Sequence, residues 1–174
     1  MSSLPVAAAS LLILSGCATP RETRASMGLI SPDQKPAFLD LKDRLQSTKG
    51  AADTTNKAEV RLVENQHNEA TTRGFTVVQD EPERIRGGSR GPTPTDYFTA
   101  AVGFCENVVF VRNAALLDLS INSLDTSVAG TWDMKGLFGI DGVQSAFTTI
   151  TVESRVTTKD PVEKVVEVAI STWV

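Results

Sequence analysis

The sequence GPTPTDYFTAAVGFC, residues 91–105, predicts a turn, a capped helix start and one cysteine within that helix. Thr93 is placed to be the N-cap, and Pro94 fits the first helical position, where its missing N–H is not needed. Asp96 stands three residues after the cap, close to a capping box, and its charge suits the positive end of the helix dipole. Apolar residues then recur at helical spacing as far as Leu116, around much of the circumference. We therefore expect a long helix that is buried on more than one side.

Upstream of this helix the sequence predicts strands and a loop. Residues 80–92, DEPERIRGGSRGP, hold two prolines, three glycines and three arginines, and predict a surface loop. The acidic pair Asp80-Glu81 at its start is expected to be solvated. Residues 59–63 and 71–78 predict two strands, and the polar stretch QHNEA, residues 66–70, predicts a hairpin connection between them.

Downstream of the helix the sequence predicts more strands and a second helix. Residues 120–132 and 146–156 read as strands, with a glycine-rich hairpin loop between them. Asp160 is expected to cap the next helix, with Pro161 at its first position and Glu163 completing a capping box. Its apolar stripe consists of Val162, Val165, Val166, Ala169, Ile170 and Trp173. The order of strands, long helix, strands and helix is an α+β pattern.

The N-terminus has two interpretations. Residues 6–14, VAAASLLIL, are too short an apolar run to span a bilayer. Together with the Leu14–Cys17 string LSGC they resemble a bacterial lipobox, in which Cys17 is lipidated, although the first five residues lack the usual Lys or Arg. In the second interpretation translation starts at Met27, and residues 1–26 are a wrongly extended start. The first predicts a membrane-anchored lipoprotein, and the second predicts a cytoplasmic protein without membrane contact.

Composition argues against several classes of function. The chain has 174 residues, enough for one ordinary domain with extensions, and 41% of them are hydrophobic. A net charge of −4 without a basic block argues against nucleic-acid binding. The single histidine, His67, rules out a multi-histidine metal site within one chain, and two distant cysteines do not make a zinc site. A Ser-His-Asp triad would need His67, which lies in a polar stretch and is expected to be solvated.

The order of motifs along residues 74–133 resembles the OsmC/Ohr family. The residues that carry the resemblance are Asp80, Glu81 and Pro82, then Gly87 and Gly88, then Gly91, Pro92, Thr93, Pro94, Asp96 and Cys105, and downstream Val128, Gly130 and Asp133. The resemblance covers residues 58–174, which we assign to an OsmC-like domain that is incomplete at its C-terminus. Residues 27–57 precede it as a short helix, expected over residues 36–46, and a linker. The resemblance implies an α+β fold, in which a curved antiparallel sheet packs on long central helices of an intertwined homodimer.

The resemblance also implies a thiol-dependent peroxidase, which reduces organic hydroperoxides with an external thiol reductant and with no cofactor or metal. The matching peroxidatic position is Cys105, whose thiolate attacks the peroxide and becomes a sulfenic acid. We expect Cys105 in an apolar setting, where desolvation disfavours a thiolate, so that a cation must reach it. In the family an arginine held by an acidic residue does this. Arg84 and Arg86 are the candidates here, with Arg73 a weaker third, and Asp96 is the matching acidic residue.

Two departures from the family pattern leave alternatives open. The best-studied members of the family carry a glutamate one position before Asp96, where this chain has Thr95. Nine residues at ~100° each place Asp96 and Cys105 on opposite sides of a straight helix, so Asp96 either orients an arginine, acts across the dimer, or only serves the helix dipole. Family peroxidases also carry a resolving cysteine on the second central helix, where none appears here. The chain is then an incomplete enzyme, an enzyme resolved by an external thiol, or a non-catalytic scaffold or apolar-ligand-binding protein.

Overall fold

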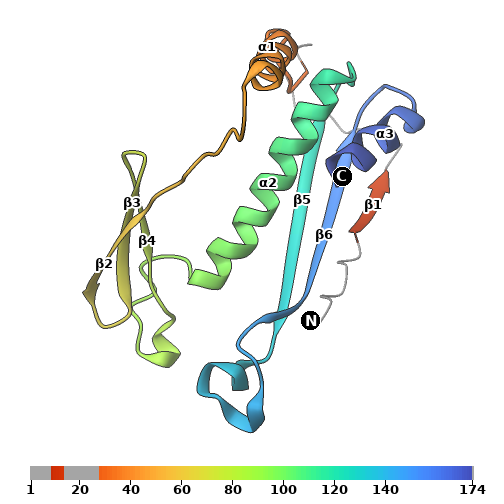
Figure 1. The fold of residues 1–174 in the computed structure, drawn as a ribbon. Coiled ribbons are helices and arrows are strands. Elements are labelled where there is room, and N and C mark those ends of the chain that lie inside the picture. The colour runs from red at the N-terminus through yellow and green to blue at the C-terminus, as the bar shows by residue number, and fades with distance from the viewer. Residues whose placement is uncertain (1–8, 14–27, 174) are drawn as a thin grey trace. The chain divides into compact units, whose positions relative to one another are not determined.

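The computed structural model describes residues 9–13 and 28–173, with side chains for the second range only. Figure 1 shows its helices and strands. Cys17 and Met27, on which the two interpretations of the N-terminus depend, lie outside the described residues, so lipidation and the start site stay predictions. None of the helices that the structure describes is long and apolar enough to cross a membrane.

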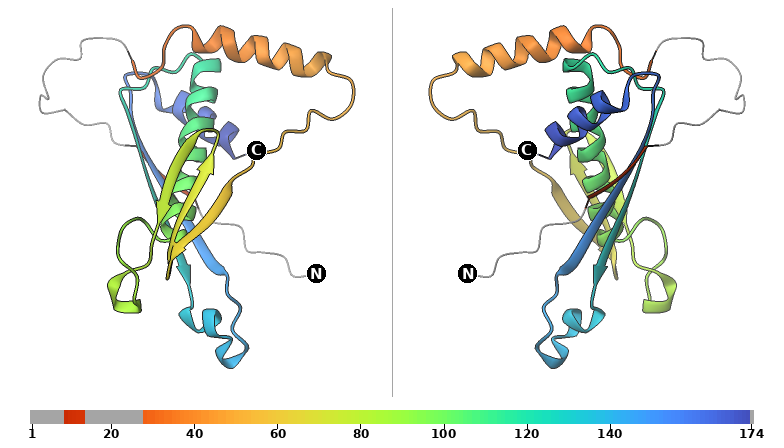
Figure 2. Two further views of the ribbon diagram at one scale, coloured as in Figure 1. Left: turned by 90° about the vertical axis from the view of Figure 1, so that its left-hand side faces the viewer. Right: turned by 90° about the vertical axis from the view of Figure 1, so that its right-hand side faces the viewer.

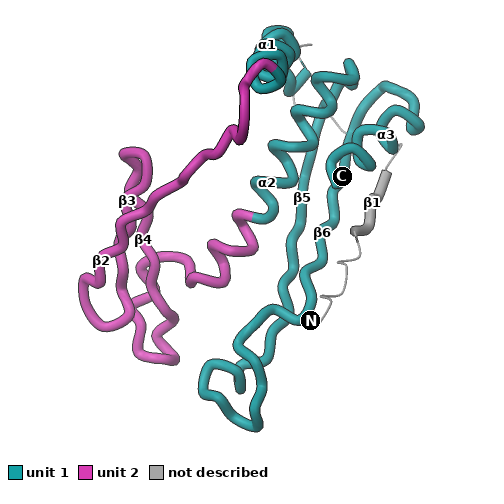
Figure 3. The backbone as a smooth tube through the Cα atoms, viewed as in Figure 1, with its two compact units in different colours: residues 1–46, 102–174 teal, residues 47–101 magenta. Residues whose placement is uncertain are grey.

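The chain forms two compact units, which Figure 3 shows in different colours. Residues 47–101 form the smaller unit, and residues 1–46 with 102–174 form the larger unit. Each unit has one three-stranded sheet among its described residues. The architecture is α+β with antiparallel strand pairs, as the sequence predicts, and the described strands form two three-stranded sheets.

The smaller unit contains an antiparallel sheet with the strand order β2-β3-β4. Its strands are β2 (Glu59–Glu64), β3 (His67–Thr72) and β4 (Phe75–Gln79). The turns form where φ is positive, at Asn65 (48°) and at Arg73 and Gly74 (51° and 82°). The predicted hairpin through residues 66–70 is wrong, because most of that stretch is the middle strand. The predicted strand over residues 71–78 is broken by the second turn, at a glycine that favours a left-handed backbone.

The long helix α2 (Pro94–Leu116) begins with the predicted capping box. The hydroxyl of Thr93 accepts a hydrogen bond from the Asp96 N–H at 3.2 Å, and the Asp96 carboxylate accepts one from the Thr93 N–H at 2.9 Å. The expectation of burial on more than one side is wrong for the single chain. Phe104 and Val108 are 69% and 65% exposed, so the described residues leave this side of the helix open.

The larger unit contains a sheet with the strand order β1-β6-β5. Its strands are β1 (Ala9–Ile13), β5 (Ser123–Trp132) and β6 (Phe147–Thr157). β5 and β6 pair antiparallel, and β1, which the sequence does not predict as a strand, pairs parallel with β6. Figure 2 shows the second half of α2 alongside the β5–β6 hairpin. The core residues between these elements are Phe110, Ala114, Leu119, Ile121, Val156, Val165 and Val168.

The last helix, α3 (Val162–Thr172), contributes Val165 and Val168 to that core. Its predicted capping box is wrong, because the Asp160 carboxylate accepts a hydrogen bond from the Ser120 N–H at 2.6 Å instead of capping the helix. The predicted apolar stripe is divided between core and surface. Its exposed members are Val162 (45%), Val166 (39%), Ile170 (62%) and Trp173 (52%).

The predicted helix near residues 36–46 is present as α1 (Gln34–Ser47), which has no buried residue. An ion pair of 2.5 Å joins Lys35 to Asp118, which follows α2. The predicted loop between β5 and β6 contains two short 3-10 turns, η2 (Met134–Phe138) and η3 (Ile140–Gly142). The helix α1 and the turns η2 and η3 are all distant in sequence from the predicted site.

Candidate functional site

Cys105 lies on α2 in the larger unit, and its side chain is exposed. The expectation of an apolar interior around this thiol is therefore wrong for the single chain. Its helical neighbours Phe104 and Val108 are also exposed, so that the thiol lies on an apolar but accessible face. A reagent in solution can reach a thiol in this position.

Glu106 follows Cys105 but lies on the buried side of the helix, with 9% of its surface exposed. Burial raises the pKa of its carboxyl. The next residue, Asn107, accepts a hydrogen bond of 2.5 Å from the Thr126 hydroxyl, which in turn contacts the Ser154 hydroxyl at 2.9 Å. Glu106 is not among the predicted site residues, although its spacing of four residues from the core residue Phe110 is the signal that predicts its burial.

The loop that contains Arg84 and Arg86 is organised by Asp80. We refer to residues 80–92 as the arginine loop. The side chain of Asp80 is 1% exposed, so the expectation of a solvated carboxylate is wrong. This carboxylate accepts three backbone N–H hydrogen bonds, from Glu81 at 2.8 Å, from Gly88 at 3.0 Å and from Arg90 at 3.3 Å. Burial alone would raise the pKa of Asp80, but these donors outweigh it and hold the pKa below its ordinary value.

Two glycines allow the arginine loop to fold back on its own start and on β4. A Cβ atom at Gly87 would lie 1.8 Å from the backbone oxygen of Glu81. A Cβ atom at Gly91 would lie 2.4 Å from the backbone oxygen of Val78. No side chain fits at such distances. The glycines in the family motif therefore have a steric role in this loop.

The two candidate arginines lie at the tip of the arginine loop, and both are exposed. Arg84 is in the short 3-10 turn η1 (Glu83–Ile85), and Arg86 follows it with a φ of 69°. No ion pair of either guanidinium group is found among the described residues. Arg73, the weaker candidate, lies in the turn between β3 and β4 and is also exposed.

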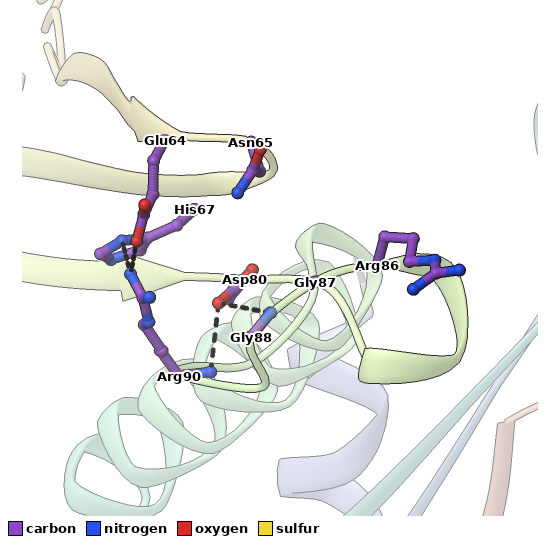
Figure 4. A pocket seen from close by; sticks show the side chains of 8 residues that line it. All are labelled: Glu64, Asn65, His67, Asp80, Arg86, Gly87, Gly88 and Arg90. Atoms are coloured by element: carbon purple, nitrogen blue, oxygen red, sulfur yellow. Dashed lines mark hydrogen bonds and ion pairs between the residues drawn. The ribbon is translucent and has the colours of Figure 1, made fainter.

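Arg90, in contrast, is already paired. Its guanidinium group forms an ion pair with Glu64 and lies 3.0 Å from His67 Nδ1. His67 is half-buried in this contact and is not freely solvated. Figure 4 shows these side chains around a pocket of about 120 Å³ between the β2–β3 turn and the arginine loop.

Asp96 has a clear local role as the N-terminal partner of Thr93. Hydrogen bonds from the side chain and the backbone of Thr93 lower the pKa of the Asp96 carboxyl. Arg84, Arg86 and Asp96 all belong to the smaller unit, whereas Cys105 belongs to the larger one. An arginine oriented by Asp96 towards the thiol stays a prediction. Among the described residues, no group of three or more His, Cys, Asp or Glu side chains could hold a metal ion.

Comparisons with known proteins agree on the fold. The family profile described as OsmC-like protein matches residues 87–173. This range includes the end of the arginine loop from Gly87, then α2 and all later elements. An OsmC-like protein from Mycoplasma pneumoniae has a similar structure, with a TM-score of 0.60 at 16% identity over 69% of this chain and 81% of that one. An OsmC-like protein of unknown function from Vibrio cholerae gives a TM-score of 0.56 at 13% identity over 68% and 87% of the two chains. No curated protein matches this sequence.

Proposed function

The chain belongs to the OsmC-like protein family, whose profile spans half of its 174 residues, and from this membership we propose that it reduces organic hydroperoxides through Cys105. The observation that carries the proposal is the exposed thiol of Cys105, which the sequence resemblance assigns to the peroxidatic position. The Cys105 thiolate attacks one peroxide oxygen, and the O–O bond breaks. The sulfur is oxidised to a sulfenic acid, and the leaving alkoxide takes up a proton and departs as an alcohol.

An external dithiol completes the proposed cycle. Its first thiol condenses with the sulfenic acid, releasing water and forming a mixed disulfide, and its second thiol displaces Cys105 and leaves as the oxidised reductant. This route uses one protein cysteine. It needs the sulfur to be accessible to a reductant, and the exposed position of Cys105 supports this requirement.

The thiolate requires a nearby positive charge, and we propose that Arg84 or Arg86 supplies it. A guanidinium group favours the charged form of a thiol. Both arginines are exposed, and no ion pair engages either one in the described residues. Arg90 is less suited to this role, because Glu64 already neutralises it.

We also propose a homodimer, because the described part of the larger unit has two exposed apolar helix faces. Phe104 and Val108 form one face on α2, and the exposed residues of α3 form the other. Exposed apolar surfaces of this kind are typical of protein interfaces. Burial against a second copy would also change the surroundings of Cys105 from open to partly enclosed.

The decisive experiment measures consumption of tert-butyl hydroperoxide by the full chain with dithiothreitol as reductant. Wild type and the Cys17→Ser control should turn over the hydroperoxide, and Cys105→Ser should not. Dimedone should trap a sulfenic acid at Cys105 in the intact-mass spectrum. Equal turnover by wild type and Cys105→Ser would contradict the proposal.

The second candidate function is a non-catalytic scaffold or apolar-ligand-binding protein. The observation that favours it is the exposed apolar surface of Phe104 and Val108 beside Cys105. This candidate predicts no peroxide consumption and slow alkylation of Cys105 at neutral pH. It also predicts a rise in fluorescence when a dye for apolar surfaces binds, and a loss of that rise in Phe104→Ser.

A further inference from the structure

The strongest unassigned feature of the smaller unit is the buried carboxylate of Asp80. One of its oxygens accepts the Glu81 N–H, and the other accepts the N–H groups of Gly88 and Arg90. A single side chain therefore joins the start of the arginine loop to two positions near its end. Figure 4 shows the second oxygen directed at both of these nitrogen atoms.

Two backbone hydrogen bonds within the arginine loop also join its later residues to its start. The N–H of Ser89 donates to the Glu81 oxygen at 3.1 Å, and the N–H of Gly87 donates to the Pro82 oxygen at 3.1 Å. The loop is thus a closed ring, and its exposed tip is the Glu83–Arg86 turn. The ring fixes the backbone from which both candidate arginines extend.

The backbone conformation of Arg86 is one that the surrounding contacts must hold in place. Its φ of 69° lies in the left-handed region, which is unfavourable for residues other than glycine and which persists only where surrounding contacts hold it. The Arg86 N–H donates to the Glu83 oxygen at 2.9 Å within the same turn. Without the ring, Arg86 would relax to a more favourable backbone conformation, and its guanidinium group would move.

The three arginines of the loop differ in their surroundings. The Arg90 N–H is bound to Asp80, and the Arg90 side chain extends towards Glu64 and His67, where Glu64 neutralises its charge. Arg84 and Arg86 remain the cations of the loop for which no partner is found in the described residues. No ion pair of Asp80 with these arginines is found in the described part of the chain, so its effect on them is through the backbone.

We infer that Asp80 is a positioning residue, which holds the arginine loop in the shape that presents Arg84 and Arg86 and so sets the reactivity of Cys105. This inference rests on the proposed function, in which one of those arginines favours the thiolate. The link between Asp80 and the thiol is the loop backbone, so Asp80 touches neither substrate nor sulfur.

Two substitutions test the anchor in different ways. Asp80→Asn replaces one of the two carboxylate oxygens by an amide N–H₂, which faces a backbone N–H donor in either orientation of the amide. Gly88→Ala keeps every charge but places a Cβ atom 2.8 Å from the Asp80 carboxylate. Glu83→Gln is the matched control, because it removes the same charge from an exposed side chain of the same loop and leaves the carboxylate of Asp80 in place.

The main measurement is the rate of Cys105 alkylation by iodoacetamide as a function of pH, on folded full-length protein checked by circular dichroism. In Asp80→Asn the midpoint of this profile should move up by about one pH unit, as expected when a thiolate loses a neighbouring cation. Gly88→Ala should move the midpoint in the same direction. Trypsin should cleave after Arg84 and Arg86 faster in both variants, and Glu83→Gln should match wild type in both assays.

The double variant Arg84→Ala/Arg86→Ala separates failure of this inference from failure of the proposed function. If it raises the midpoint while Asp80→Asn and Gly88→Ala leave it unchanged, the positioning role of Asp80 is overturned and the role of the arginines stands. An equal upward shift in Glu83→Gln also overturns the inference, because a substitution that leaves the Asp80 hydrogen bonds in place would then have the same effect. If the double variant has no effect, the arginine part of the proposed function is itself refuted.

Discussion

The carboxylate of Asp80 lies 3.0 Å from the backbone nitrogen of Gly88, eight residues further along the chain. Both residues belong to the motifs by which the sequence resembles its family. Their contact shows that these motifs form one structure, a carboxylate at the start of the loop and a glycine near its end where the backbone approaches it. The same contact predicts how the loop responds to acid.

Acid should open the arginine loop by protonating Asp80. Its pKa is lowered in the folded chain, so the stabilisation that it provides is fully present above the ordinary value of 3.8 and is lost as the pH falls through the folded-state pKa. Hydrogen exchange at the Gly88 and Arg90 amides should therefore accelerate below that ordinary value in wild type, after correction for intrinsic exchange. Asp80→Asn should exchange rapidly at every pH. A wild-type profile with constant protection down to pH 2 would contradict this assignment.

The capping box at the start of α2 predicts a matched pair of variants. Thr93→Ala removes the side-chain partner of the Asp96 N–H and should destabilise the chain by about 1 kcal/mol, measured by urea unfolding. Asp96→Asn weakens the same box, because a neutral amide binds the Thr93 N–H less strongly. If Asp96 also orients an arginine, Asp96→Asn should slow peroxide turnover more than Thr93→Ala does. Equal turnover in the two variants would limit Asp96 to capping.

Local patterns predict part of this structure well. The start of α2 depends on residues three positions apart, so the sequence alone locates Thr93, Pro94 and Asp96 correctly. The predicted cap at Asp160 is wrong for the opposite reason. Its carboxylate has a competing donor in Ser120, forty residues earlier in the chain, and no local pattern reveals that donor.

The candidate site is less predictable, because it depends on closure of the chain over longer distances. Asp80 is buried because the arginine loop folds back over it. The local sequence shows only two neighbouring acidic residues, Asp80 and Glu81, and therefore predicts that both are solvated. An apolar pattern on a helix predicts that one face will be covered, but it does not identify the element or the chain that covers this face. In α2 that face includes Phe104 and Val108, which the single chain leaves exposed.

Glu106 predicts a pH dependence of the opposite sign to that of Asp80. Burial raises its pKa in the folded chain, so folding favours the protonated carboxyl, and stability falls as the pH rises from the ordinary value of 4.5 towards the folded-state pKa. Glu106→Gln should therefore have a higher Tm than wild type at pH 7.5 and the same Tm at pH 4. Glu163→Gln, an exposed acid on α3, is the control and should show no such divergence. A lower Tm for Glu106→Gln at pH 7.5 would show that the ionised carboxylate has a stabilising partner.

The uncovered face of α3 predicts that a single charge will separate the proposed dimer. Ile170 is 62% exposed in the single chain and lies in the row of apolar side chains formed with Val166 and Trp173. Burial of a glutamate at this position without a partner is costly, so Ile170→Glu should reduce the mass measured by light scattering from that of a dimer to that of a monomer. Ser171→Glu adds the same charge at the next exposed position of the helix and should leave the dimer intact. If wild type is already monomeric at micromolar concentration, the exposed apolar faces do not mediate self-association, and the apolar-ligand alternative gains support. If both variants dissociate, net charge and not this face controls assembly.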